Sequence, residues 1–259
     1  MTYDELKRIY DSVGDVRGWD FSRTRTDRDP VPWDYSEIVR RYLRPSSRVL
    51  DVATGGGEVF LALAPHVGFG IGTDSSATMI QTAQENTPPS LADKVSFVEM
   101  RAQELALPPA SFDVVLDRHG PVFVDQIVPL LRPQGYFITQ QVAGRNLQSI
   151  FSVFGWGSNG AYWRRYWQEN GLLAQDVASL RERFIQAGCS PIAHGEYDVP
   201  FYFRDVASLL FYLKAIPLPE DFDIERHWEP VSRLIAEYST PRGIGSNEHR
   251  QLLIVQKPE

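Results

Sequence analysis

The sequence predicts an α/β fold built on a doubly wound, mostly parallel sheet with helices on both faces. Between Arg48 and Thr139, short apolar runs that indicate buried strands alternate with helical segments. Continuous apolar strands separated by helices are typical of parallel sheets that are covered on both sides. In such sheets a ligand lies beyond the carboxyl ends of the strands, near the switch in strand order. The residues that directly follow each strand are therefore the first candidates for a functional site.

The predicted elements follow one another in a regular order up to residue 142. The expected strands are 48–52, 69–73, 95–99, 114–116 and 136–139, and helices over 59–63, 77–86 and 122–131 separate them. Before them, the pattern predicts helices over 3–13 and 35–43, the second ending near Pro45. After them, it predicts an amphipathic helix that ends at Gly188, strands over 192–203 and 251–256, and helices over 206–215 and 226–238.

These elements suggest an N-terminal segment followed by one main domain. Residues 1–45 are expected to form a helical lid segment, since an arginine-rich stretch with several prolines follows the first helix. Residues 46–259 are expected to form the α/β domain. The later part of this domain departs from the strand–helix rhythm, so we expect inserted cap helices at about 147–171 and 204–240.

Composition limits the possible function classes. The 259 residues carry 26 basic and 33 acidic side chains, a net charge of −7, which argues against a nucleic-acid-binding surface. A single cysteine, Cys189, excludes a disulfide framework or a cysteine-rich metal site within one chain. The chain shows neither an N-terminal signal pattern nor a long apolar span, so we expect a cytoplasmic protein with no membrane partner.

The glycine-rich stretch "DVATGGGEV" follows the first predicted strand of the sheet. A P-loop requires Lys and Ser or Thr after its last glycine, whereas Glu58 follows here and would repel a phosphate. A dinucleotide fingerprint requires a third small residue where this chain has Phe60, which would obstruct close helix–strand packing. Both of these readings of the loop are disfavoured.

The same stretch resembles motif I of the class I S-adenosylmethionine-dependent methyltransferases, in which an acidic residue precedes glycines at alternate positions. Here the strand residues "VLD" lead into Ala53, Gly55 and Gly57. Ala53 replaces the first glycine, as it does in the similar motif of the ubiquinone and menaquinone C-methyltransferases. The resemblance implies a Rossmann-like, seven-stranded sheet, and it implies that Asp51 helps to hold the ammonium group of the cofactor.

Further motifs of that family follow in order along the chain. Asp74 ends the second predicted strand, where the family binds the ribose diol, and Ser76 is expected to cap the next helix. "RAQELALPPASFDVVLD" is similar to the family's adenine-binding segment, with Arg101 where an acidic residue is frequent. The resemblance implies S-adenosylmethionine as cofactor, S-adenosylhomocysteine as product and these cofactor-binding positions: Asp51, Ala53, Thr54, Gly55, Gly57, Asp74, Ser75, Met79, Arg101, Ala102, Gln103 and Arg118.

The acceptor is expected to be a small molecule. The segment after the fourth strand is "DRHG", not the Asn/Asp-Pro-Pro-Tyr/Phe of amino-methylating enzymes, and Cys189 is misplaced for cytosine C5 chemistry. His119 is the candidate general base, because histidine can accept a proton near neutral pH. Alternatively, Arg118 and His119 bind the glycine loop or close over the cofactor. The remaining histidines lack ligand spacing, so no metal is expected.

Aromatic residues provide candidates for a lid over the substrate. They are Trp19 and Trp33 in the N-terminal segment, and Tyr162, Trp163 and Trp167 on a predicted helix. Each could instead belong to an ordinary hydrophobic core. The sequence leaves open a quinone-type C-methyltransferase and a non-catalytic S-adenosylmethionine-binding protein, and the chain is expected to act as a monomer or homodimer.

Overall fold

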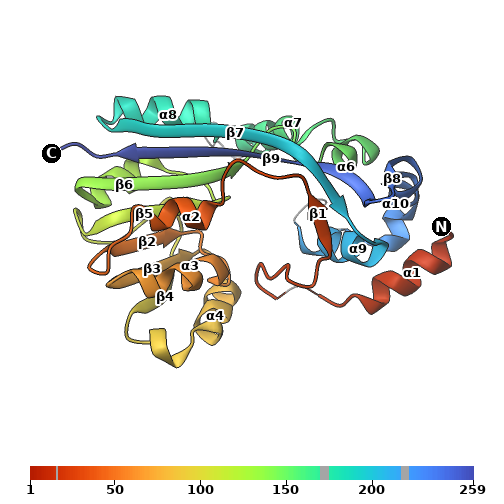
Figure 1. Cartoon of the computed structure of the whole chain (residues 1–259), viewed down its shortest axis with the longest axis horizontal. Coiled ribbons are helices and arrows are strands. Elements are labelled where there is room, and N and C mark those ends of the chain that lie inside the picture. The colour runs from red at the N-terminus through yellow and green to blue at the C-terminus, as the bar shows by residue number, and fades with distance from the viewer. Residues whose placement is uncertain (16, 170–174, 217–221) are drawn as a thin grey trace. The chain divides into compact units, whose positions relative to one another are not determined.

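The computed structural model describes residues 1–15, 17–169, 175–216 and 222–259 (Figure 1). By compactness the chain divides into two units. The first unit comprises Met1–Val31, Ala143–Leu172 and Tyr197–His249, and the second comprises Pro32–Val142, Leu173–Glu196 and Arg250–Glu259. The expected lid segment, residues 1–45, is shared between the two units, and both expected cap ranges fall in the first.

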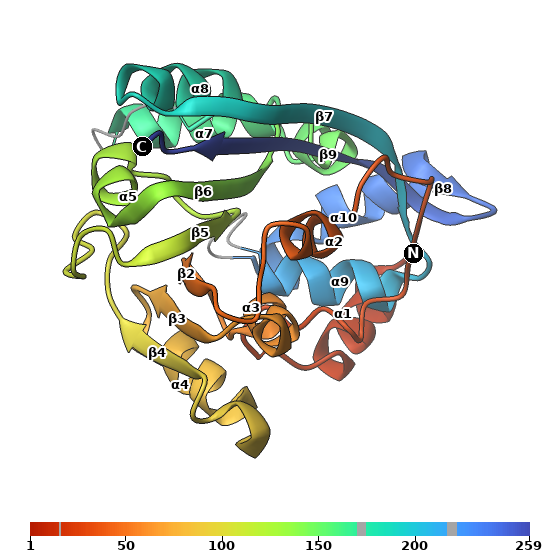
Figure 2. The ribbon, with the colours of Figure 1, turned by 60° about the vertical axis from the view of Figure 1, so that its left-hand side comes forward.

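The second unit is built on five adjacent parallel strands. They lie side by side in the order β4-β3-β2-β5-β6 (Figures 1 and 2). Because β2 pairs with β3 on one side and with β5 on the other, the strand order switches between β2 and β5. The strands are β2 (Arg48–Val52), β3 (Phe69–Asp74), β4 (Val95–Glu99), β5 (Phe112–Arg118) and β6 (Leu131–Val142).

Helices of the second unit cover the sheet on both faces with separate apolar clusters. On one face α2 (Tyr35–Arg40), α3 (Glu58–Leu63) and α4 (Ala77–Asn86) contribute to a cluster that includes Phe60. On the other face α5 (Val124–Leu130) and α8 (Val177–Gln186) pack around Phe137, whose ring stacks on Phe184 at 4.8 Å between centroids. Two short 3-10 helices, η1 (Ala64–His66) and η2 (Pro89–Leu91), complete the connections.

The first unit is mainly helical. Its helices are α1 (Tyr3–Ser12), α6 (Gln148–Val153), α7 (Asn159–Glu169), α9 (Val206–Ala215) and α10 (Ile224–Tyr238). Helix α1 packs against α9 and α10, and α6 packs against α10. The shared core includes the fully buried side chains of Leu6, Leu209 and Leu234. Two short strands, β1 (Thr26–Arg28) and β8 (Ser239–Thr240), also lie in this unit.

Two long strands, β7 (Ser190–Phe203) and β9 (Gly243–Gln256), contribute residues to both units. Strand β9 runs antiparallel to β6 and neighbours β7, which pairs with β1. The predicted α/β class with a mostly parallel sheet is confirmed. The sheet has nine strands in the described residues where seven were expected, because β1 and β8 are too short and polar to show an apolar pattern.

Most predicted bounds agree with the structure, and those of β2, β4, α4 and α9 agree to the residue. Polar side chains define where helices begin. Ser76, the predicted cap of α4, accepts the backbone N–H of Met79, and Thr2 forms a capping box with Glu5. Strand β6 extends past its predicted end because its antiparallel ladder with β9 continues through the polar residues Gln140 and Gln141. Strand β9 begins earlier than predicted, and its first residues pair with the short strand β8.

Replacing the core residue Phe137 by alanine should lower the free energy of unfolding by roughly 3–5 kcal/mol, because truncation removes a fully buried ring and leaves a cavity. Thermal and denaturant unfolding of the purified variant measure this loss. Val98→Ala, on the edge strand β4 and 40% exposed, is the control and should change stability by less than about 0.5 kcal/mol. Equal losses in both variants would contradict the assigned core.

Candidate functional site

Asp74 joins two loops at the carboxyl edge of the parallel strands. Its Oδ2 accepts the backbone N–H of Gly55 at 2.9 Å, and its Oδ1 accepts that of Ser76 at 2.9 Å. The first contact reaches the β2–α3 loop and the second begins α4, so the carboxylate fixes both loops relative to β3. Each carboxylate oxygen can accept more than one hydrogen bond, so Asp74 retains acceptor capacity for a ligand.

The glycine loop after β2 uses left-handed backbone conformations. Gly55 and Gly57 have φ values of +59° and +76°, and Ala53 has +54°. A non-glycine residue in this region carries a strain of roughly 1–2 kcal/mol, so Ala53 is held by its surroundings. A side chain on Gly57 would lie 3.0 Å from the ring of Phe97. The loop therefore needs small residues at these positions.

Asp51 is a buried carboxylate at the end of β2. It is 8% exposed, and its Oδ2 accepts the hydroxyl of Thr54 at 2.6 Å. Burial raises the pKa of Asp51 to about 7, although the Thr54 hydrogen bond and the charge of Arg118 act in the opposite direction. A cationic ligand beside this carboxylate would favour its charged form.

Asp117, at the end of β5, is a second buried carboxylate that the sequence reasoning missed. Its Oδ1 accepts the side-chain amide of Gln141 at 2.9 Å and the backbone N–H of Gly120 at 3.1 Å. Its Oδ2 is buried and has no hydrogen-bond partner among the residues the structure describes. Burial raises the pKa of Asp117 to about 7, and the charge of Asp51 adds to the rise. The repeated "VLD", at the ends of β2 and β5, was the available signal.

His119 directly follows strand β5 and has a left-handed backbone conformation with φ +68°. Its backbone N–H donates to the carbonyl of Gln140 at 3.0 Å. The imidazole is exposed to solvent. Surrounding protein and the charges of Arg118 and Arg250 lower the pKa of His119 well below its ordinary value. A lowered pKa leaves the ring neutral at pH 7 and able to accept a proton.

The segment after β4 presents a free backbone donor. Ala102 is 9% exposed, and its N–H has no partner among the described residues. Arg101 and Gln103 beside it are exposed, as is Ser75 after β3, while Met79 in α4 is half-buried. The predicted cofactor-binding positions all belong to the second unit and lie at the ends of strands β2, β3 and β5 or in the segments that follow β2, β3 and β4.

The predicted lid residues divide between the two units. Trp33 belongs to the second unit, where its indole N–H donates to Gln140 Oε1 at 3.0 Å and its ring packs on Gly195. Trp19, Tyr162 and Trp163 belong to the first unit. Tyr162 and Trp163 pack against the apolar core of that unit, and Trp163 also donates to Asn159 at 3.1 Å. The side chain of Trp167 lies outside the described residues.

Neither a metal-binding cluster nor a membrane-spanning helix occurs in the described part of the chain. No group of three or more histidine, cysteine, aspartate or glutamate side chains there is arranged to hold a metal ion. No helix in that part is long and apolar enough to cross a membrane.

Comparison with known proteins finds similarity centred on these loops. A family model described as a methyltransferase domain matches residues 49–135. YcgJ of Bacillus subtilis, an uncharacterized methyltransferase, is 33% identical over 77 residues. That aligned stretch covers 30% of this chain and about 30% of the length of YcgJ.

Solved structures share the fold at low sequence identity. BH2331 of Bacillus halodurans, a proposed methyltransferase, has a TM-score of 0.61 at 17% identity, covering 87% of this chain and 99% of its own. The structure of YcgJ has a TM-score of 0.58 at 15% identity, covering 87% and 98%. The [4+2]-cyclase SpnF has a TM-score of 0.55 at 14% identity, covering 99% and 93%. These likenesses establish the fold, and the cyclase shows that the fold alone does not fix the reaction.

The raised pKa of Asp51 predicts a pH-dependent effect of Asp51→Asn on stability without ligand. The pKa in the folded protein lies above the value near 4 in an unfolded chain, so Asp51 lowers stability as pH rises from about 4 to 7. At pH 8 the variant should therefore melt a few degrees above the wild type. At pH 5, where Asp51 is protonated in the folded protein but mostly ionised in the unfolded chain, this difference should be clearly smaller, and it should vanish only below about pH 4. A variant that melts below the wild type by the same margin at both values would contradict the assignment.

Proposed function

We propose that this chain, whose residues 49–135 match a methyltransferase domain, is a class I S-adenosylmethionine-dependent methyltransferase that transfers a methyl group to a small-molecule acceptor by in-line displacement. The observation that carries the proposal is the pair of loops fixed by Asp74, which lie within the matched residues 49–135. They stand beyond the carboxyl ends of parallel strands beside the switch in strand order, where α/β sheets bind their ligands.

The side chains and backbone groups at this edge fit the cofactor. Asp74 has acceptor capacity left for a ribose diol, and Ala102 has a free N–H for an adenine nitrogen. Asp51 is a buried carboxylate whose charged form an ammonium group would stabilise. These groups match the polar and charged parts of S-adenosylmethionine.

For this reaction the protein mainly has to orient the donor and the acceptor and to exclude water from the site. When bound, the cofactor supplies an electrophilic methyl group on a sulfonium centre, whose transfer needs a nucleophile in line with the breaking bond. Asp51 and Asp74 would fix the donor from two neighbouring strands. His119, neutral at pH 7 and at the end of β5, would accept a proton from an acceptor that must lose one.

Two features support a small-molecule acceptor. The net charge of −7 disfavours a polyanionic acceptor, and "DRHG" after β5 differs from the motif of enzymes that methylate amino groups of DNA or protein. The candidate lid residues Trp19, Trp33, Tyr162, Trp163 and Trp167 remain proposals for acceptor contacts. Trp33 is the candidate in the same unit as the cofactor positions, where its indole N–H is directed to Gln140, opposite Arg118 in the β5–β6 ladder.

Titration calorimetry should detect binding of both S-adenosylmethionine and S-adenosylhomocysteine. Asp74→Ala should weaken each by about tenfold or more, because hydrogen bonds to a charged group contribute roughly 1.5–3 kcal/mol. Asp93→Ala is the matched control, since Asp93 is exposed before β4 and loses the same charge. Absence of binding by the folded wild type would overturn the proposal. Binding without turnover on any acceptor would favour a non-catalytic or non-transferring protein.

A second test separates a proton-accepting from a merely structural role of His119. If His119 is the general base, His119→Asn should lower kcat by about 10²–10⁴-fold and leave the affinity for S-adenosylhomocysteine unchanged. The wild-type rate should also fall at acid pH as the imidazole is protonated, and the variant should lack that dependence. Weakened S-adenosylhomocysteine binding with an unchanged pH profile would instead assign His119 to the cofactor site.

A further inference from the structure

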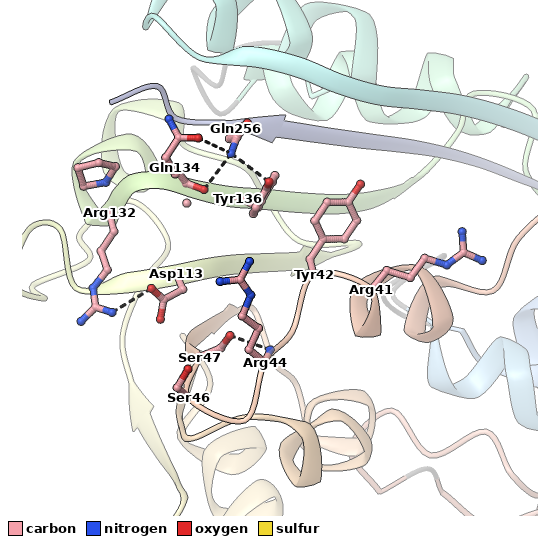
Figure 3. A pocket seen from close by; sticks show the side chains of 12 residues that line it. Arg41, Tyr42, Arg44, Ser46, Ser47, Asp113, Arg132, Gln134, Tyr136 and Gln256 are labelled. Atoms are coloured by element: carbon pink, nitrogen blue, oxygen red, sulfur yellow. Dashed lines mark hydrogen bonds and ion pairs between the residues drawn. The ribbon is translucent and has the colours of Figure 1, made fainter.

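A cavity of about 630 Å³ lies at the amino edge of the parallel strands, the edge opposite the glycine loop (Figure 3). It belongs wholly to the second unit, because its lining comes from the α2–β2 loop, the starts of β5 and β6 and the end of β9. Its volume is within the range of small-molecule sites. Its lining includes Arg44, Tyr42, Asp113, Arg132, Tyr136 and Gln256.

A tight turn fixes the position of Arg44. The N–H of Ser47 donates to the carbonyl of Arg44 at 2.8 Å, and the N–H of Arg44 donates to Ser47 Oγ at 2.9 Å. Pro45 occupies the second position of this turn, which its ring favours. The carbonyl of Ser47 in turn accepts the N–H groups of Gly68 and Phe69 at the start of β3. The backbone that carries Arg44 is thus held on both sides before any ligand binds.

The charge of Arg44 is not neutralised by the cavity. Asp113 is the acidic residue in the lining of the cavity, and both of its carboxylate oxygens are engaged. Oδ1 accepts the guanidinium of Arg132 at 2.9 Å, and Oδ2 accepts the backbone N–H of Arg48 at 2.7 Å. Arg44 forms no ion pair or hydrogen bond through its side chain in the described part of the chain. Figure 3 shows its guanidinium extending from the loop toward β5 and β6, whereas that of Arg41 extends away.

Two tyrosines provide neutral donors and an apolar surface beside Arg44. The rings of Tyr42 and Tyr136 meet at 4.8 Å between centroids with an interplanar angle of 60°. Gln256 Nε2 donates to the hydroxyl oxygen of Tyr136 at 3.0 Å, which leaves the phenolic proton of Tyr136 free to donate elsewhere. The hydroxyl of Tyr42 makes no hydrogen bond within the described residues.

We propose that this cavity binds a small organic phosphate, with Arg44 as the main contact to the phosphate and Tyr42 and Tyr136 against the organic part. A guanidinium together with hydroxyl donors suits a group with three terminal oxygens better than it suits a single neutral acceptor. The site is separate from the proposed cofactor site, because the two lie at opposite edges of the same strands.

The test measures the binding of phenyl phosphate to the full chain by calorimetry and maps the bound position by NMR chemical-shift changes. The wild type should bind phenyl phosphate saturably, and inorganic phosphate more weakly. Phenol, which lacks the phosphate, should not bind. Arg44→Ala should weaken phenyl phosphate binding by about tenfold or more. Arg40→Ala is the matched control and should leave affinity within about twofold, because Arg40 is exposed on α2 and does not line the cavity.

Other outcomes would overturn the proposal. Equal losses in Arg44→Ala and Arg40→Ala would mean that net charge alone attracts the anion. Displacement of phenyl phosphate by S-adenosylhomocysteine would locate it at the other edge, and failure of both phosphates to bind the folded wild type would remove the site. Because the readout is binding at the amino edge, failure here leaves the proposed methyl transfer intact, and failure of cofactor binding leaves this site intact.

Discussion

Asp74 accepts two backbone N–H groups, one from Gly55 and one from Ser76, and the candidate site depends on these contacts. They tie the β2–α3 loop and the start of α4 to the end of the same strand, beside the backbone hydrogen bond from the N–H of Thr54 to the carbonyl of Thr73. The loop can reach Asp74 because Gly55 and Gly57 adopt left-handed conformations, and Ala53 is forced into one. A carboxylate that organises two loops has its own orientation set before a ligand arrives, so little entropy is lost when a diol binds to it.

The two buried carboxylates at the ends of β2 and β5 concentrate acidic groups at this edge of the sheet. Asp51 and Asp117 are buried, their pKa values are raised to about 7, and Asp117 Oδ2 has no partner in the described residues. A fold selected for stability alone would replace such groups with apolar ones or pair them. Their retention is understandable if a cationic ligand supplies the missing interaction, which is the property expected of a sulfonium cofactor with an ammonium group.

Local patterns were sufficient to predict the strands and the main motif, but not the contacts between distant segments. Apolar runs bounded by turn residues gave β2 and β4 to the residue, and strand ends correctly located Asp51 and Asp74. The buried environment of Asp117 was missed because it depends on Gln141, which only the β5–β6 pairing brings beside it. Strands β1 and β8 were missed because two or three polar residues carry no periodicity. The predicted lid roles of Trp19, Trp33, Tyr162, Trp163 and Trp167 stay predictions.

The cavity around Arg44 shows why net charge does not describe a binding surface. The chain carries −7 overall, which weighs against a long polyanion as a partner, yet charge at a site is local and is screened within about 10 Å. At the carboxyl edge, the buried carboxylates of Asp51 and Asp117 favour a positively charged ligand. At the amino edge, the carboxylate of Asp113 forms an ion pair with Arg132 and accepts the backbone N–H of Arg48. The positive charge of Arg44 is therefore not balanced by Asp113. Parallel strands separate these edges by their own length, so one sheet can hold a cation at one end and an anion at the other without either weakening the other.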